Sequence, residues 1–344
     1  MNRLFTPFIC ALVCWVSNAT AQSGGTGVMS VFDLPLHARS MAWGGYLLAS
    51  PLSDVQFAIN NPGLLNKELS GQYGATFGSI APGVRQGGAA YAHTIGNHNL
   101  SLHAQYLDYG TMEGYDAGGN YQGDIMANEM KFTLGYAREV IPRLDVGSQL
   151  GFGYSVLGPY VSTAAFVNLG AHYSRSDTGI YWGLVVKNLG MQLISYRGAD
   201  REPLPFNIQL GATYKPLHMP FRFHATLHTL QKWDITYNQY LGTGQLDLNG
   251  NPIQNEVASF GEKAMRHLSL GGELVLGKHL GVLIGYNHQR RMEMSPSIRG
   301  GLAGFGWGIR IKVWKYHLTY ASASLFPGQN TNTLSLSLIP SFYN

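Results

Sequence analysis

Charged residues are scarce in this sequence. Asp, Glu, Lys and Arg together make up 12% of the chain, whereas about 25% is usual for a soluble domain. The net charge of +4 is small for 344 residues, so the chain lacks the basic surplus that is typical of nucleic-acid binding. A protein of this size with water on all sides would carry more charge. The composition therefore argues against an ordinary soluble domain.

Cysteine is confined to the first residues. The chain begins MNRLFTPFICALVCWVSNATAQ, where Arg3 precedes an apolar stretch and an Ala-x-Ala pattern stands just before Gln22. This order is typical of a cleavable secretory signal, and the apolar stretch is shorter than the ~20 residues of a spanning helix. Cys10 and Cys14 both fall within residues 1–21. We therefore expect the mature chain to have no disulfide, no catalytic thiolate and no cysteine-ligated metal.

Long apolar runs are also missing after the predicted signal. No later stretch reaches the ~18 apolar residues that indicate a transmembrane helix, and the mean hydropathy is −0.04. A chain that avoids charge and has no spanning helix fits a transmembrane β-barrel, because polar residues alternate with lipid-facing apolar ones in barrel strands. The 44 glycines suit crowded or kinked strand positions.

Strict alternation of apolar and polar residues is the main pattern present. In PFRFHATLHTL (220–230), an extended chain carries Phe221 and Phe223 on one face and Arg222 and His224 on the other. We expect the apolar face to meet lipid and the polar face to meet the lumen. The same period of two predicts about fourteen strands, near residues 70–80, 84–94, 98–109, 129–139, 143–155, 161–174, 179–189, 205–215, 219–229, 266–277, 280–290, 298–310, 312–321 and 331–340.

The connections between these segments alternate in length. Every second connection is a short turn, and the others include long ones near residues 110–128, 190–204, 230–265, 291–297 and 322–330. Outer-membrane barrels have this asymmetry, with the short turns in the periplasm, whereas a soluble β-sandwich has no reason for it. The predicted fold class is an all-β, antiparallel transmembrane barrel of about fourteen strands that lies in the outer membrane of a bacterium.

The stretch before the first predicted strand does not alternate. Residues 34–65 mix short helical possibilities with turn-forming residues. We expect this part to fold inside the lumen as a plug with a turn at Asn60, Asn61 and Pro62, the alternative being a periplasmic extension. The predicted organisation is a signal peptide, an N-terminal plug or extension, and a barrel, at residues 1–21, 22–69 and 70–344.

Several blocks of the sequence resemble known outer-membrane barrels. ARSMAWGG (38–45) followed by DVQFAINNPGLL (54–65) resembles the N-terminal pattern of the FadL-like barrels, which supports the fold more than a function. Within that group, four later blocks resemble the PorQ family of the type IX secretion system of Bacteroidetes: GLVVKNLG (183–190), REPLPFNIQLGATYK (201–215), PFRFHATLHTLQKWDITY (220–237) and LTYASASLFPGQNTNTLSLSL (318–338).

This resemblance implies a barrel that anchors a complex at the cell surface. Its partners would be PorU, PorV and PorZ, which process exported cargo and attach it to lipopolysaccharide, and the barrel itself would have no catalytic role. We expect the loop at residues 230–265, with Trp233, Tyr237 and Tyr240, to contact a partner, because aromatic side chains anchor interfaces. The wider FadL-like group suggests the alternative of a channel for hydrophobic small molecules, gated by the plug.

Motifs for catalysis or metal binding are weak. His224 and His228 share a strand face, but about 13 Å separates them at ~3.3 Å per residue, too far for one ion. No Gly-x-Ser-x-Gly elbow is present, although an outer-membrane hydrolase whose triad is not a local motif stays open. We therefore predict no catalytic residue, no cofactor and no metal ligand.

Overall fold

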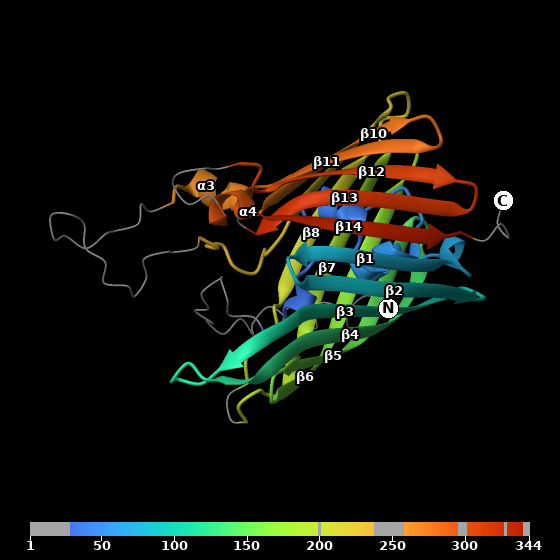
Figure 1. Cartoon of the computed structure of the whole chain (residues 1–344). Helices are drawn as coiled ribbons and strands as arrows, with labels where there is room; N and C mark the ends of the chain where they lie inside the picture. The colour runs from blue at the N-terminus through green and yellow to red at the C-terminus, as the bar shows by residue number, and fades with distance from the viewer. Residues whose placement is uncertain (1–27, 199–200, 237–257, 295–300, 327–328, 340–344) are drawn as a thin grey trace.

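The structure is a computed structural model that describes residues 28–198, 201–236, 258–294, 301–326 and 329–339. It is a closed barrel of fourteen antiparallel strands, in which consecutive strands pair and β14 pairs with β1 (Figure 1). The strands are β1 (Tyr73–Ala81), β2 (Val84–Ile95), β3 (His98–Tyr115), β4 (Tyr121–Ile141), β5 (Leu144–Leu157), β6 (Tyr160–Arg175), β7 (Ile180–Ile194), β8 (Asn207–Tyr214), β9 (Phe221–Leu227), β10 (Leu268–Leu276), β11 (Leu280–Asn287), β12 (Phe305–Val313), β13 (Tyr316–Phe326) and β14 (Gln329–Leu338). Within these ranges, no helix is both long and apolar enough to cross a membrane.

The two faces of the wall are as the alternation predicted. In β9, Phe221 and Phe223 are 42% and 50% exposed on the outer surface, whereas Arg222 and His224 are buried on the inside. An outer surface of apolar side chains around a polar interior is the arrangement that a barrel needs in lipid. The predicted fold class is confirmed.

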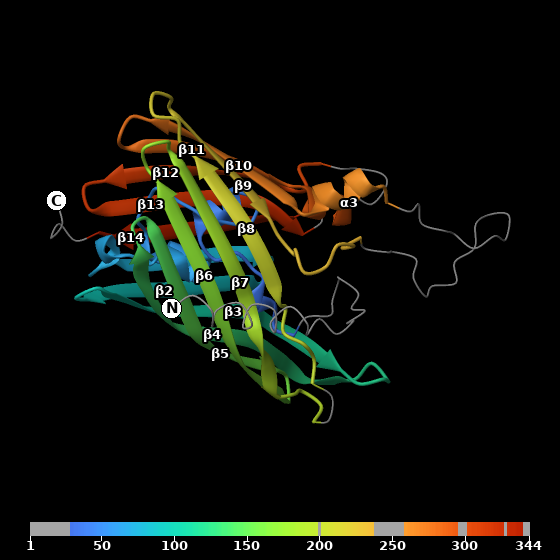
Figure 2. The same ribbon diagram turned by 180° about the vertical axis from the view of Figure 1, so that it is seen from behind.

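The long connections lie at one end of the barrel, and the other end carries short turns (Figures 1 and 2). The end with the long connections also carries the short ones from β1 to β2, from β5 to β6 and from β13 to β14. Short turns join β2 to β3, β4 to β5, β6 to β7, β8 to β9, β10 to β11 and β12 to β13. We call this end the short-turn rim and the other the long-loop rim. In outer-membrane barrels the short turns face the periplasm.

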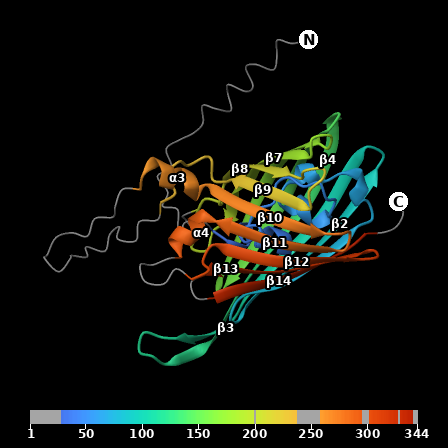
Figure 3. The same ribbon diagram turned by 90° about the horizontal axis from the view of Figure 1, so that it is seen from above.

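The long-loop rim contains structure that the sequence did not predict. Helix α3 (Phe260–Arg266) follows the long loop after β9, and helix α4 (His288–Glu293) follows β11. The prediction of a long connection at residues 110–128 was wrong, because β3 and β4 continue as a paired hairpin from Thr111 opposite Met126 to Tyr115 opposite Tyr121. The prediction of a long connection at residues 322–330 was also wrong, because β13 runs to Phe326 and β14 begins at Gln329. The hairpin of β3 and β4 projects beyond the rest of the barrel (Figure 3). Glycines at 110, 114, 118, 119 and 123 made a paired extension look like a loop.

Residues 28–72, called the lumenal segment below, lie inside the barrel (Figures 1 and 2). The segment contains η1 (Ser30–Phe32), α2 (Ala38–Ala42), η2 (Val55–Ile59), η3 (Pro62–Leu64) and η4 (Lys67–Leu69), and it continues directly into β1. It contacts the wall on several sides through hydrogen bonds to residues of β4, β6, β10 and β14. Its role as a plug stays a prediction. The predicted signal peptide falls in residues 1–27, outside the described residues.

Candidate functional site

Helix α2 fixes the middle of the lumenal segment. The His37 ring caps it by accepting a hydrogen bond from the Arg39 backbone N–H at 3.0 Å, and the Ser40 hydroxyl donates to the His37 carbonyl at 2.7 Å. The opposing wall carries glycine where the helix passes, and a Cβ on Gly306 would lie 3.0 Å from the carbonyl oxygens of Met41 and Ala42. Glycine thus lets the helix backbone approach the wall closely.

Arg39 leaves this helix to enter a buried ionic cluster in the wall. Its Nη1 donates to Glu273 Oε2 at 2.7 Å, and Arg310 Nε donates to Glu273 Oε1 at 2.8 Å. Arg222 Nη1 also donates to Glu273 Oε2. All four side chains are buried, so removing one partner would leave uncompensated charge in a poorly solvated place. The cluster holds α2 against β9, β10 and β12.

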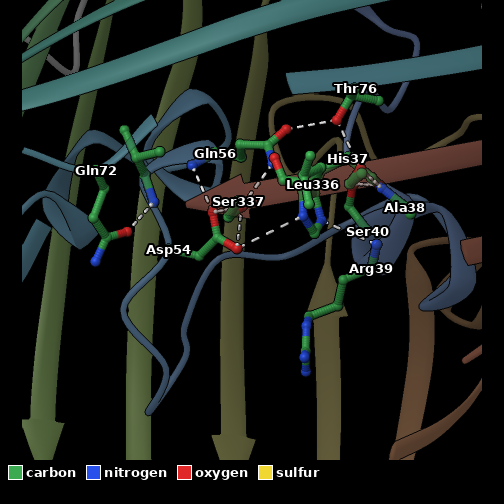
Figure 4. A network of polar contacts seen from close by, with 12 residues as sticks. His37, Ala38, Arg39, Ser40, Asp54, Gln56, Gln72, Thr76, Leu336 and Ser337 are labelled. Carbon is green, nitrogen blue, oxygen red and sulfur yellow. Dashed lines mark hydrogen bonds and ion pairs between the residues drawn. The ribbon is translucent and has the colours of Figure 1, made fainter. Parts of the chain in front are cut away.

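A second network joins the lumenal segment to the first and last strands (Figure 4). The Ser337 hydroxyl of β14 lies 2.9 and 2.8 Å from the two Asp54 carboxylate oxygens. Gln56 Nε2 donates to Ser337 Oγ at 2.8 Å, and Gln56 Oε1 accepts from the Thr76 hydroxyl of β1 at 2.5 Å. Gln72 Oε1 accepts from the Val55 backbone at 3.3 Å. The seam between β1 and β14 is therefore covered on its lumenal side by hydrogen-bonded side chains.

Burial sets the protonation of the ionisable groups in this network. Burial, reinforced by the Arg39 charge, lowers the pKa of His37 to about 3, so the ring is neutral at pH 7. Burial also raises the pKa of Asp54, although its hydrogen bonds from Gln56 and Ser337 oppose this rise. The His37 and Asp54 side chains approach to 4.0 Å, but a neutral imidazole forms no ion pair. The contact is polar rather than ionic at neutral pH.

The predicted turn lies deep in the lumen. Asn61 caps η3 by accepting from the Gly63 N–H at 2.8 Å, with Pro62 in the first helical position. Its amide also donates to the Leu48 carbonyl at 2.7 Å and to the Ala171 carbonyl of β6 at 3.1 Å. Asn61 therefore ties two parts of the lumenal segment to the wall. The function of Asn60, Asn61 and Pro62 as a plug turn stays a prediction.

The first part of the lumenal segment forms an apolar cluster with the part of the wall nearest the long-loop rim. Phe32 packs edge-on against Phe166 of β6, with 4.8 Å between the ring centroids. Two polar contacts hold this end: the Val31 N–H donates to Glu129 Oε2 at 2.7 Å, and Lys131 Nζ donates to the Val31 carbonyl at 3.2 Å. The other members of this apolar cluster are Val28, Met29, Ile80, Leu107, Ala164 and Leu204.

Little space is left between the middle of the segment and the wall. A cavity of about 10 Å³ lies beside His37, Gln56 and His103, which is room for about one water molecule. Nδ1 of His103 is buried there without a hydrogen-bond partner. Among the described residues, no group of three or more histidines, cysteines or carboxylates is arranged to hold a metal ion.

The predicted partner loop is described only in part. Trp233 is 51% exposed, its ring lies 5.1 Å from that of Phe260 in α3, and it stacks on His267 at 5.6 Å. Tyr237 and Tyr240 lie outside the described residues. Partner contact by this loop stays a prediction.

The alternation placed Arg222 on the polar face of its strand but did not reveal its cluster with Glu273 and Arg39. The signal was the charge itself, because an inward Glu on a wall strand requires a cationic partner. What the alternation could not give was the register of β9, β10 and β12, or the position of the lumenal segment between them.

No protein-family model matches the sequence, and no curated protein matches it. Solved structures share its fold. The toluene transporter TodX of Pseudomonas putida is similar with a TM-score of 0.55 and 11% identity, over 90% of this chain and 100% of that one. The toluene transporter TbuX of Ralstonia pickettii gives 0.53 and 11%, over 91% and 100%. A FadL homologue of Pseudomonas aeruginosa gives 0.50 and 9%, over 90% and 100%. At such identities the likeness shows the fold alone, that of FadL-type outer-membrane barrels.

Proposed function

We propose that this barrel lets small hydrophobic molecules cross the outer membrane, with the lumenal segment as its gate. The fold supports this proposal, since it matches proteins described as toluene transporters over their whole length. It is the alternative suggested by the FadL-like sequence pattern, and it now has better support than the assembly role implied by the resemblance to the PorQ family.

The apolar cluster around Phe32 is the observation that carries the proposal. It lies on the long-loop side of the lumen and is one of three apolar clusters that the lumenal segment forms with the wall among the described residues. It is built from the start of the lumenal segment and from residues of β1, β3, β6 and the loop after β7. A hydrophobic molecule that displaced Phe32 would find a ready apolar site, because burial of apolar surface drives such binding.

The start of the segment is held by contacts separate from those that hold its middle. Two hydrogen bonds fix Val31, whereas α2 is held by the buried Glu273 cluster and by its close contact with the wall. Displacement of η1 alone would therefore open the lumen near the long-loop rim while the remainder of the segment stays in place.

Uptake measurements test this proposal. Cells that carry or lack the gene would be compared for uptake of radiolabelled toluene and of a long-chain fatty acid, with a hydrophilic sugar as the control. We expect the barrel to accelerate uptake of at least one hydrophobic probe and to leave the sugar unchanged. Equal uptake of both hydrophobic probes with and without the gene would rule out the channel.

A second candidate is the assembly role in type IX secretion, with PorU, PorV and PorZ as partners and lipopolysaccharide as the acceptor of cargo. The projecting hairpin of β3 and β4 favours it, because Tyr115 and Tyr121 are exposed on a ribbon that extends past the rim. Neither candidate requires catalysis by this chain.

Purification from the native membrane separates the two candidates. Co-purification of these partners, together with loss of surface display in a deletion strain, would support the assembly role. Recovery of the barrel alone, with surface display intact, would refute it.

A further inference from the structure

Cations outnumber carboxylates inside the barrel near the short-turn rim. Arg39, Arg222 and Arg310 all contact Glu273. Their side chains are 2%, 6% and 9% exposed, and that of Glu273 is fully covered. One carboxylate thus serves three guanidinium groups that are shielded from water.

These guanidinium groups have more donors than acceptors. A carboxylate offers about four lone-pair sites, whereas each guanidinium carries five N–H donors. Nε of Arg39 and Nε of Arg222 are buried without a hydrogen-bond partner among the described residues, and so is Nε2 of the nearby His317. Unpartnered buried donors are costly, so the cluster as it stands lacks an acceptor.

A further cation lies between this ionic cluster and the short-turn rim, which faces the periplasm in outer-membrane barrels. Lys312 lies two residues beyond Arg310 on the same face of β12, directly opposite His317 of β13. Lys312 is exposed, and no carboxylate of the described residues forms an ion pair with it. We call Arg39, Arg222, Arg310, Lys312 and His317 the basic cluster.

A second carboxylate nearby does not balance the basic cluster. Asp54 bonds to Ser337, which lies opposite His317 in the β13–β14 register. Its oxygens already accept hydrogen bonds from Ser337 and the Gln56 backbone, and in Figure 4 the Arg39 side chain points away from it. Four permanent cations therefore face two carboxylates, one of which is engaged elsewhere.

From this imbalance we infer that the basic cluster binds an anionic phosphate group at the periplasmic mouth of the lumen. Guanidinium groups bind phosphate oxygens through paired, charge-assisted hydrogen bonds. Lys312 is placed to meet the anion at the opening, and Arg310 and His317 lie behind it. The phosphate could belong to a phospholipid headgroup of the periplasmic leaflet or to a free phosphate ion. This site lies at the opposite end of the lumen from the Phe32 cluster, so it does not depend on the proposed channel.

Calorimetric titration of the purified barrel in detergent tests the inference. Inorganic phosphate is one probe, and phosphatidylglycerol in mixed micelles is the other, with zwitterionic phosphatidylcholine as its reference. We expect binding of phosphate, of phosphatidylglycerol over phosphatidylcholine, or of both, and weaker binding as salt rises. Phosphate alone would identify a free ion as the ligand, and phosphatidylglycerol alone would identify a lipid.

Two variants and a matched control locate the site. Lys312→Gln and Arg310→Gln should each weaken binding by about tenfold, the usual effect of losing a charge-assisted hydrogen bond. Lys315→Gln is the control, because Lys315 lies at the same turn but its Nζ lies over the Trp314 ring, 4.9 Å from the ring centroid. The affinity of this variant for the anion should match that of the wild type. Lys312 is exposed, so its variant decides the matter even if Arg310→Gln fails to fold. No binding of either probe, or an unchanged affinity in Lys312→Gln, would overturn the inference.

Discussion

Arg39 in the lumenal segment donates to Glu273 in the wall across 2.7 Å, although 234 residues separate them along the chain. Both side chains are buried, and Arg39 shares the Glu273 carboxylate with Arg222 and Arg310. Because this ion pair joins the lumenal segment to the wall, the stability of the wall depends on the segment being docked.

Glu273→Gln should therefore destabilise the barrel strongly. The change leaves three buried arginines without their shared carboxylate, and breaking a buried ion pair in this way costs about 3–5 kcal/mol. Guanidinium-induced unfolding in detergent would measure the loss. As a control, Asp177→Asn removes an exposed carboxylate that lies 3.6 Å from Arg143 and Arg175, and it should cost less than about 1 kcal/mol. Equal effects of the two variants would contradict the role of the buried cluster.

Gly183→Ala tests the contact between the wall and the lumenal segment. A Cβ at Gly183 would lie 2.0 Å from the Leu48 carbonyl oxygen, so the backbone of the segment must move. We expect a loss of about 1–3 kcal/mol and faster protease cleavage within residues 28–72. Gly272→Ala is the matched control, since its Cβ would meet only Ile284 Cγ2 at an ordinary 3.6 Å. If Gly183→Ala behaved like Gly272→Ala, the packing described between the segment and β7 would be wrong.

Acid should loosen the lumenal segment through His37. Its pKa is about 3 in the folded protein against 6.5 for a free imidazole. The neutral ring therefore stabilises docking fully above pH 6.5, and this contribution is lost as the pH falls from 6.5 toward 3. The loss amounts to about 2–3 kcal/mol at pH 4.5. Asp54 acts in the opposite direction, because its raised pKa favours the protonated form that acid supplies.

The variant His37→Asn isolates this effect. Asparagine keeps a side-chain acceptor for the start of α2 but cannot titrate. Stability measured between pH 7.5 and 4.5 should fall more steeply in the wild type than in His37→Asn. Parallel curves for the two proteins would show that His37 does not carry the acid sensitivity.

Phe32→Ala should weaken the apolar cluster that carries the proposed channel. Truncating a buried Phe costs about 3–5 kcal/mol where the surroundings cannot collapse, and here the cost falls on the docking of η1. We expect toluene uptake to rise in cells that carry the variant. Phe77→Ala removes the same volume from the lipid-facing surface, where Phe77 is 60% exposed, and should leave uptake unchanged. A rise in neither variant would count against a gate at Phe32.

The local pattern of the sequence predicted the wall well. Alternation placed Phe223 outside and His224 inside because a strand side chain has only two directions to choose from, and the lengths of the connections separated the two rims. It failed at residues 110–128, where glycines concealed a continued hairpin, and at residues 322–330, where β13 and β14 continue almost to each other. It also missed the contacts of Arg39, His37 and Asn61. These contacts depend on which distant strands pack against the lumenal segment, and local alternation does not determine that arrangement.

The side chains of Gln56 and Asp54 lie over the join between the first and last strands. Gln56 contacts Thr76 on one side of this join and Ser337 on the other. The bonds of Gln56 and Asp54 to Ser337 can form only after the last strand has met this part of the chain. It follows that the pairing of β14 with β1 and the docking of the lumenal segment occur together as one cooperative step of folding. A substitution at Gln56 would therefore slow barrel closure rather than the formation of the individual hairpins.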